Sequence, residues 1–320
     1  LFSTVVRSHF EEDSIPFKQT QIAGWILDPD RKKMSKSKGN VVTPMALLEQ
    51  YGSDAVRYWA CNGRPGVDTA YDEGVMKNGR RLVTKMLNAS KFVLTILNEI
   101  GVDESEFDKV EITNKVDQSF LCGLNEMLTR ATKAFEDLDY ARSLEVTESA
   151  FWDFCDNYVE IVKSRAYGSQ GADLALQAGA TLKIALNVFT KMFAPITPFT
   201  CDEIYSWISK DSIHIQSWPS EQEILRFPDV ISSEQSESRN LELKDIYPYL
   251  SELSVHPRGF KTNQKVSLKT ELAYFNISDV EEKIAMAEYI EADLKDVAKA
   301  NKIGWTKADA FNFDIELKND

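Results

Sequence analysis

The chain has 320 residues, of which 43% are hydrophobic, and its 37 lysines and arginines face 50 aspartates and glutamates, giving a net charge of −13. Such an acidic balance, taken alone, argues against a nucleic-acid-binding protein. No apolar run approaches the length of a membrane span, so we expect no membrane partner. The first residue is Leu1 and no signal peptide follows it, so we interpret the chain as a fragment or a processed product.

The cysteines and histidines form no pattern typical of a catalytic or metal-binding site. The cysteines are widely spaced and include no Cys-x-x-Cys pair, which disfavours zinc and favours a reducing, cytoplasmic setting. The histidines are scattered as well. We therefore predict packing roles, and no metal site, for Cys61, Cys122, Cys155, Cys201, His9, His214 and His256.

Positive charge is concentrated in two stretches of this acidic chain. Residues 31–38 carry five basic residues and no acid, and residues 74–98 again carry five and no acid. Screening confines each electrostatic field to roughly 10 Å, so a local basic patch can still hold phosphates. Either patch, considered by itself, is also compatible with an ordinary charged surface.

The predicted elements begin after a mixed N-terminal stretch, residues 1–27, whose end from Gln19 to Leu27 has the apolar content of a buried strand. The turn signal Asp28-Pro29-Asp30 and a basic loop follow. Thr43 and Pro44 suit the N-cap and first position of a helix through Gln50. A second short helix is predicted from 53 to 59.

From Glu73 onward the pattern is helical for more than a hundred residues. Apolar residues recur at alternating steps of three and four along four segments, 82–100, 116–138, 144–161 and 174–192, and a shorter helix follows from Pro198 to Ile208. Helices of this length with short connections predict an antiparallel bundle. We expect the aromatic residues of the third segment to pack in its core, and Lys163 and Arg165 to be favoured only by the helix dipole.

The last hundred residues predict a small α+β unit behind a linker. Residues 231–240 are polar and poor in apolar residues, as linkers are. Residues 266–275 alternate like a strand, 280–297 carry a helical stripe, and 311–317 alternate again. No basic coiled coil is apparent, and the role of this tail stays unassigned, with packing as the favoured interpretation.

The segment Lys32–Asn40 carries the clearest chemistry. Several lysines and small hydroxyl residues on a loop suit a polyphosphate, because ammonium groups neutralise phosphate charge as compact, adaptable points. Ser35 and Ser37 can donate further hydrogen bonds, and Gly39 permits a sharp turn. In nucleotidyl transfer, donors that engage the departing pyrophosphate more strongly in the transition state accelerate the reaction. Composition alone also permits a basic surface loop.

The order Lys33-Met34-Ser35-Lys36-Ser37 resembles the KMSKS signature of class I aminoacyl-tRNA synthetases. The flanking segments 24–27, 39–44 and 51–57 resemble the strand, exit and helix around that signature. The resemblance implies that residues 33–37 bind ATP, which enters with Mg²⁺ as a substrate complex. Lys33 and Lys36 match the two lysines that stabilise the transition state of adenylate formation, and Lys36 is the stronger candidate. Asp54 and Arg57 match a pair that holds the loop-bearing region, which could equally be an ordinary i, i+3 helix pair.

Within the family, residues 66–82 and 85–92 resemble the valine-specific members, with the isoleucine-specific members as the alternative. In these enzymes the bundle binds the tRNA anticodon stem and loop. Two arginines that contact the anticodon in some relatives correspond to Ala70 and Gly74 here. The resemblance implies that tRNA(Val) is bound by basic, amide and aromatic side chains of the first long helix, namely Arg80, Arg81, Lys85, Asn88, Lys91 and Phe92. Two alternatives stay open: Phe92 neighbours the apolar stripe and could be a core residue, and individual basic residues could belong to a solvated helix face.

The resemblance implies a mainly α chain of four parts. These are the end of a Rossmann-like catalytic domain with the KMSKS loop (1–72), a helical anticodon-binding bundle (73–218), a linker (219–240) and a small α+β C-terminal domain (241–320). The second signature of the family, a HIGH-type motif, does not occur, and neither does an amino-acid pocket or an editing domain. We therefore expect the N-terminal catalytic and editing portions to be missing, and the chain alone to be inactive with ATP and valine. A freestanding tRNA-binding module and a helical protein with acidic partners are the rival interpretations.

Overall fold

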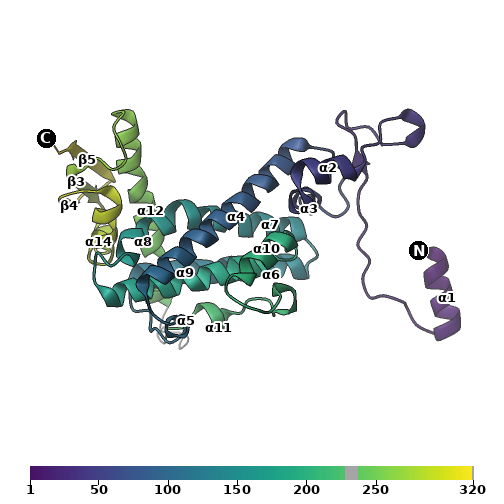
Figure 1. The fold of residues 1–320 in the computed structure, drawn as a ribbon, viewed down its shortest axis with the longest axis horizontal. Helices are drawn as coiled ribbons and strands as arrows, with labels where there is room; N and C mark the ends of the chain where they lie inside the picture. Colours follow the sequence, from purple (N-terminus) through teal and green to yellow (C-terminus); the bar gives the residue numbers. More distant parts are fainter. Residues whose placement is uncertain (228–236, 319–320) are drawn as a thin grey trace.

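The computed structural model describes residues 1–227 and 237–318 and is mostly helical (Figure 1). Helix α1 (Phe2–Glu12) lies apart from the rest of the molecule at the end of an extended segment, and none of its side chains is buried. The mixed composition of residues 1–27 did not predict this helix. In the described parts of the chain, no helix combines the length and the apolar character that crossing a bilayer requires.

The loop-bearing segment follows α1. It contains strand β1 (Ile26–Leu27), the 3₁₀ turn η1 (Lys36–Lys38), helices α2 (Pro44–Tyr51) and α3 (Ser53–Cys61), and strand β2 (Thr69–Ala70), which pairs in parallel with β1. The two short helices are confirmed, whereas the predicted strand is reduced to its last two residues. Both helices lie at one end of the long helix α4 (Figure 1).

The bundle is built from long helices whose apolar stripes face one another. Its members are α4 (Glu73–Ile100), α6 (Lys115–Glu136), α7 (Tyr140–Asp153), the π-helical turn η2 (Phe154–Tyr158), α8 (Val159–Ala166), α9 (Ala172–Phe193) and α10 (Pro198–Ser206). Short elements α5 (Glu104–Phe107), η3 (Ile213–Ile215) and α11 (Glu221–Ile224) flank them. The predicted stripes and the aromatic core are confirmed except at Leu138, which lies beyond the end of α6 and is exposed. In the core, Phe120 stacks on Tyr158 with ring centroids 3.7 Å apart.

The tail combines one long helix with a small sheet at the other end of α4 (Figure 1). Its elements are α12 (Glu237–Asn263), β3 (Leu272–Asp279), α13 (Glu281–Ile284), α14 (Ala287–Ala298), β4 (Ile303–Lys307) and β5 (Asn312–Leu317). Strand β3 is central, parallel to β4 and antiparallel to β5. The α+β prediction is confirmed, although α12 and β4 were not anticipated.

The predicted linker, residues 219–240, is only partly a linker. Helix α11 interrupts its beginning, and α12 already starts at Glu237. Residues 228–236 lie outside the described residues. Buried Leu250 and Leu253 of α12 belong to the same apolar core as Phe120 and Phe189 of the bundle. The tail therefore packs on the bundle through a shared core, and the four-part division of the chain stays a prediction.

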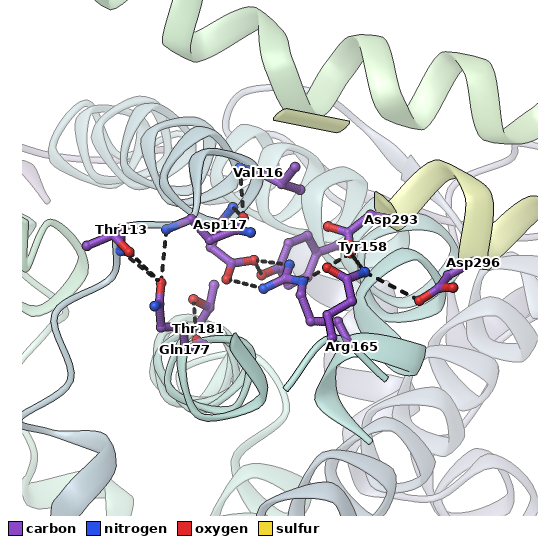
Figure 2. A network of polar contacts seen from close by, with 11 residues as sticks. Thr113, Val116, Asp117, Tyr158, Arg165, Gln177, Thr181, Asp293 and Asp296 are labelled. Atoms are coloured by element: carbon purple, nitrogen blue, oxygen red, sulfur yellow. Dashed lines mark hydrogen bonds and ion pairs between the residues drawn. The ribbon is translucent and has the colours of Figure 1, made fainter. Parts of the chain in front are cut away.

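A buried ionic network also joins the bundle to the tail (Figure 2). Arg165 of α8 is 0% exposed and donates two 2.7 Å hydrogen bonds to the carboxylate of Asp117 in α6. Its Nε donates to Asp293 of α14 at 3.0 Å, and Gln170 donates to the same carboxylate. The expectation that only the helix dipole favours Arg165 is therefore wrong, because two buried carboxylates hold it in place.

Tyr158 completes this network at the centre of the bundle. Its hydroxyl donates to Asp117 at 2.7 Å. Burial, together with the neighbouring Asp117 carboxylate, raises the pKa of this hydroxyl well above its usual range, so it stays a donor. Each oxygen of Asp117 thus accepts from Arg165, and one also accepts from Tyr158, as a buried carboxylate requires.

Candidate functional site: a lysine loop and a basic helical groove

The lysine loop is closed at its base by Asp28 and Asn40. The side-chain amide of Asn40 donates to the Asp28 carboxylate at 2.7 Å, and its carbonyl oxygen accepts the Ser35 amide at 2.9 Å. Asp28 also accepts the backbone amide of Lys32 at 2.7 Å. The Lys32 amide, followed by the Asn40 amide, lowers the pKa of the Asp28 carboxyl below its usual value. The two ends of the loop are therefore held together by charge-assisted hydrogen bonds.

The lysines of the loop are exposed. The ammonium group of Lys33 lies 3.8 Å from the centre of the Trp25 ring, a cation–π contact. Lys36 begins the turn η1, and Gly39 follows the turn with a φ of 68°, a left-handed conformation that favours glycine. Within the part of the chain that the structure describes, Lys36 has no carboxylate within ion-pair distance. Its charge is therefore available to an incoming anion.

The hydroxyl groups of the loop lie close together. Ser35 Oγ and Ser37 Oγ are 3.1 Å apart, and Ser37 is exposed. Met34 and Ser35 are half-buried, and the backbone at Lys33 bridges to Leu27 of β1. The loop thus presents two ammonium groups and two hydroxyl groups from one short segment, a donor set suited to phosphate oxygens.

Asp54 and Arg57 of α3 dock the loop-bearing segment onto the bundle instead of pairing with each other. The Asp54 carboxylate accepts the Thr200 amide at 2.7 Å and the Phe199 amide at 3.4 Å, at the start of α10. Arg57 donates to the carbonyl oxygens of Pro195 and Ile196. The alternative interpretation, an i, i+3 pair between Asp54 and Arg57 within α3, is therefore wrong. Asp54 satisfies the free amides of another helix, as an N-cap residue does.

The basic side chains of α4 line an open groove. Arg80, Arg81, Lys85 and Asn88 surround a hollow of about 660 Å³ together with Gln50, Tyr51, Lys77, Thr84 and Trp152. A second hollow, of about 230 Å³, continues from Lys85 and Asn88 to Phe92 and Lys163. We call these two hollows the α4 groove. It brings together five of the six predicted tRNA-binding residues.

Lys91 is the predicted residue that the α4 groove does not include. Its ammonium group lies 5.6 Å from the centre of the Trp207 ring, which belongs to the segment after α10. Phe92 fits both interpretations, because it packs against the apolar core and also lines the groove. The ammonium group of Lys163 lies 4.9 Å from the centre of its ring. Helical periodicity alone could not show that Phe92 lines the groove while the adjacent Lys91 lies outside it.

Some groove cations have protein partners. Lys85 forms a 2.7 Å ion pair with Asp156 and lies 5.7 Å from the Trp152 ring centre. Arg80 donates to the carbonyl oxygen of Gln50 at 3.0 Å, which ties the start of the groove to α2. These half-exposed contacts are weak in water, because solvent screens them. They orient the side chains and leave the groove positively charged.

Sequence reasoning missed four residues that shape these sites, Asp28, Asn40, Trp152 and Lys163. The first two stand at the ends of the loop, and an Asp and an Asn spaced twelve apart around a basic run offered a usable signal. Trp152 and Lys163 lie on α7 and α8, far along the chain from α4. Their contribution depends on helix packing, which no local pattern reports.

Two family models match the chain. The model for class I tRNA synthetases (I, L, M and V) matches residues 2–72, which contain the lysine loop. The model for the anticodon-binding domain of tRNA ligases matches residues 117–274, which run from α6 into the tail. Helix α4 lies between the two matches.

Curated relatives extend the similarity over nearly the whole chain. A valine–tRNA ligase of Cutibacterium acnes is 42% identical over 99% of this chain, and one of Thermobifida fusca is 54% identical over 70% of it. The chain spans 34% and 25% of their lengths. A solved ternary complex of Agrobacterium radiobacter K84 LeuRS with tRNA and LeuAMS shares the fold, with a TM-score of 0.54 at 18% identity, covering 69% of this chain and 26% of that one.

These relatives disfavour the isoleucine alternative and the two rival interpretations. The matched segments contain the lysine loop held by Asp28 and Asn40, and most of the helices that surround the α4 groove. The chain therefore belongs to the class I aminoacyl-tRNA synthetase family, and it corresponds to part of a valine–tRNA ligase.

Proposed function

We propose that this chain is the portion of a valine–tRNA ligase that stabilises the pyrophosphate of ATP and holds the anticodon region of tRNA(Val). The observation that carries the proposal is the lysine loop, 33–37, closed at its base and presenting Lys36 without a carboxylate partner in the described structure. Valine, ATP and its Mg²⁺ are substrates of the whole enzyme. The setting is the cytoplasm.

In the proposed mechanism the loop acts on charge that develops during adenylate formation. As a carboxylate oxygen of valine attacks the α-phosphorus, the bond from that phosphorus to the oxygen bridging the β-phosphate breaks, and negative charge builds up on the departing pyrophosphate. Lys33 and Lys36 donate to its oxygens, with Ser35 and Ser37 as further donors. Because these contacts strengthen in the transition state, they raise kcat more than they tighten ATP binding. The metal arrives with ATP, and no cluster of three or more potential metal ligands occurs among the described residues.

The chain needs the remainder of the enzyme for this chemistry. Trp25 and Ile26, which flank the loop, are exposed, and α1 buries none of its side chains. The segment before the loop therefore lacks an apolar core of its own, which supports a larger catalytic domain around it. We expect no valyl-adenylate from the isolated chain.

Substitution of Lys36 tests the role of the loop. In the full-length enzyme, Lys36→Ala should lower ATP–pyrophosphate exchange by roughly 10²-fold, because a transition-state charge contact is lost. Lys38→Ala is the matched control, since Lys38 lies in the same 3₁₀ turn but outside residues 33–37. Near-normal exchange in the Lys36 variant, or an equal loss in both variants, would refute the assignment.

Binding of tRNA transcripts tests the role of the α4 groove. The chain should bind the valine transcript more tightly than the isoleucine transcript, and a changed valine anticodon should remove the difference. Affinity should fall steeply with salt, because cations that neutralise phosphates release counterions. An Arg81→Ala variant should weaken binding, whereas Arg7→Ala, which removes an exposed arginine of α1, should not. Equal binding of both transcripts would remove the case for valine.

A further inference from the structure

A third hollow lies where the tail packs on the bundle. It has a volume of about 440 Å³ and is bounded by α8, by the C-terminal half of α12, by the segment that follows α12 and by the end of α14. We call it the tail hollow. It lies outside the six predicted tRNA-binding positions, and no step of the proposed mechanism uses it.

Positive charge predominates in the tail hollow. Its lining contains two carboxylates, Glu160 and Asp296, against five cations, which are Lys163, Arg258, Lys261, Lys269 and Lys299. Asp296 is already engaged, because it accepts hydrogen bonds from Ser169 and Gln170. Glu160 lies 3.8 Å from Lys163 at the edge of the α4 groove. Lys269 and Lys299 are exposed, so their ammonium groups can reach an anion in the hollow.

Two of these cations, Lys261 and Arg258, are fully or partly buried and form no ion pair with a carboxylate among the described residues. Lys261 is 2% exposed, and its ammonium group donates to the carbonyl oxygens of Ala298 at 2.8 Å and Leu268 at 3.2 Å. Arg258 donates through Nη1 to the carbonyl oxygen of Asp156, while its buried Nη2 has no hydrogen-bond partner within the described structure. A buried cation costs free energy unless an anion or further acceptors compensate it. An anion in the hollow would supply that compensation.

The tail hollow continues the α4 groove. The two hollows of the groove share Lys85 and Asn88, and the tail hollow shares Glu160 and Lys163 with the nearer of them. From Lys77 to Phe92 the groove follows α4 for about 22 Å, at 1.5 Å per residue. One line of cations therefore runs from the loop-bearing end of α4 to the tail.

The buried network fixes this alignment. Arg165 of α8 binds Asp293 of α14, one turn from Asp296 (Figure 2). Gln170 donates to both aspartates. The walls of the hollow contributed by α8 and α14 are thus held together by buried hydrogen bonds. The hollow is a preorganised feature of the described fold rather than a chance gathering of mobile lysines.

We propose that the tail hollow binds a backbone phosphate of the same tRNA that occupies the α4 groove. This inference rests on the proposed function. A phosphodiester fits because it brings one negative charge and several acceptors to ammonium and guanidinium donors. The continuity with the groove favours an RNA strand over a separate acidic peptide. The contact adds affinity and orientation and carries no base information.

The test compares two pairs of lysines on the tail. Lys269→Gln/Lys299→Gln removes two exposed cations of the hollow, and Lys295→Gln/Lys302→Gln removes two exposed cations of the tail outside it. Binding of the valine transcript to the full 320-residue chain is measured across a salt series. The first variant should bind several-fold more weakly and reduce the slope of log K against log salt by about 1. The second should match the unsubstituted chain.

The outcome for an altered anticodon separates phosphate binding from base recognition. The hollow variant should lose the same factor of affinity for the valine transcript and for a transcript with a changed anticodon. A loss confined to the valine anticodon, or equal losses in both lysine pairs, would overturn the inference while the proposed function stands. If the unsubstituted chain binds no tRNA at low salt, the proposed function and this inference fail together.

Discussion

At the scale of single residues, the carboxylate of Asp28 holds the two ends of the lysine loop together. The amides of Lys32 and Asn40 donate to its carboxylate and lower its pKa below the usual 3.8. Because the folded pKa lies below the unfolded one, these bonds stabilise the loop at all pH values above the unfolded pKa. They are lost as the pH falls through the folded pKa. The loop should therefore stay closed from about pH 4 upward.

A titration followed by NMR checks this expectation. The carboxyl carbon of Asp28 should titrate with a midpoint below 3.8 in the intact chain. Asn40→Ala should move the midpoint upward and accelerate hydrogen exchange of the Ser35 amide, because the bonds of the Asn40 side chain to Asp28 and Ser35 disappear. An unchanged midpoint in the variant would mean that Asn40 does not hold the carboxylate.

The lysine loop could be predicted from the sequence because the order of residues 33–37 is local and specific. The buried pairing of Arg165 with two carboxylates could not be predicted from the sequence. Its two partners, Asp117 and Asp293, lie 48 and 128 residues away along the chain. Local rules for helix ends describe the helix that carries a charge, but only tertiary packing decides whether that charge is buried.

At the scale of elements, the contact between α3 and α4 depends on Gly79. A methyl group at this position would lie 2.7 Å from the Tyr58 ring, and Tyr58 is itself held by a 2.7 Å bond to Glu148. Gly79→Ala should therefore lower the free energy of unfolding by about 1–3 kcal/mol, despite the better helix propensity of alanine.

Gly123 of α6 is the matched control, because an added methyl group there has no neighbour within 4 Å among the described atoms. Gly123→Ala should raise the free energy of unfolding by about 0.5–1 kcal/mol through helix propensity alone. Urea denaturation of both variants measures the difference. If both substitutions stabilise the chain equally, the close approach of α3 and α4 is not rigid.

The elements that periodicity predicted best are long helices with one exposed and one buried face, such as α4 and α6. Helix α12 escaped prediction because Pro248 and Pro257 lie inside it and its first residues are polar. Proline removes an amide donor and normally ends a helix, so the pattern indicated a break. Burial against α6 overrides that local preference. Strand β4 is short and has Gly304 as its second residue, so its pattern gave no clear strand signal.

At the scale of the whole molecule, Arg165 connects the bundle to the tail. Arg165→Ala would leave Asp117 and Asp293 buried without their cation, which should lower the free energy of unfolding by about 3–5 kcal/mol. Urea denaturation measures the loss. Hydrogen exchange should accelerate more in α14 than in α9, because α14 loses its buried partner.

Arg142→Ala is the control for this substitution. Arg142 forms a 3.0 Å ion pair with Glu145, and both side chains are about half exposed. Solvent screening limits such a pair to roughly 1 kcal/mol or less. A similar effect of both substitutions would show that the buried network contributes little to the docking of the tail.

The length of α4 constrains how related chains can vary. Its 28 residues span about 42 Å, with the loop-bearing segment packed at its start and the groove along its face. Inserting or deleting a single residue would turn everything beyond that point by about 100°, carrying the groove away from the loop. A change of about seven residues, close to two full turns, would nearly restore the same face. We expect natural variants to conserve the register of α4 even where its sequence drifts.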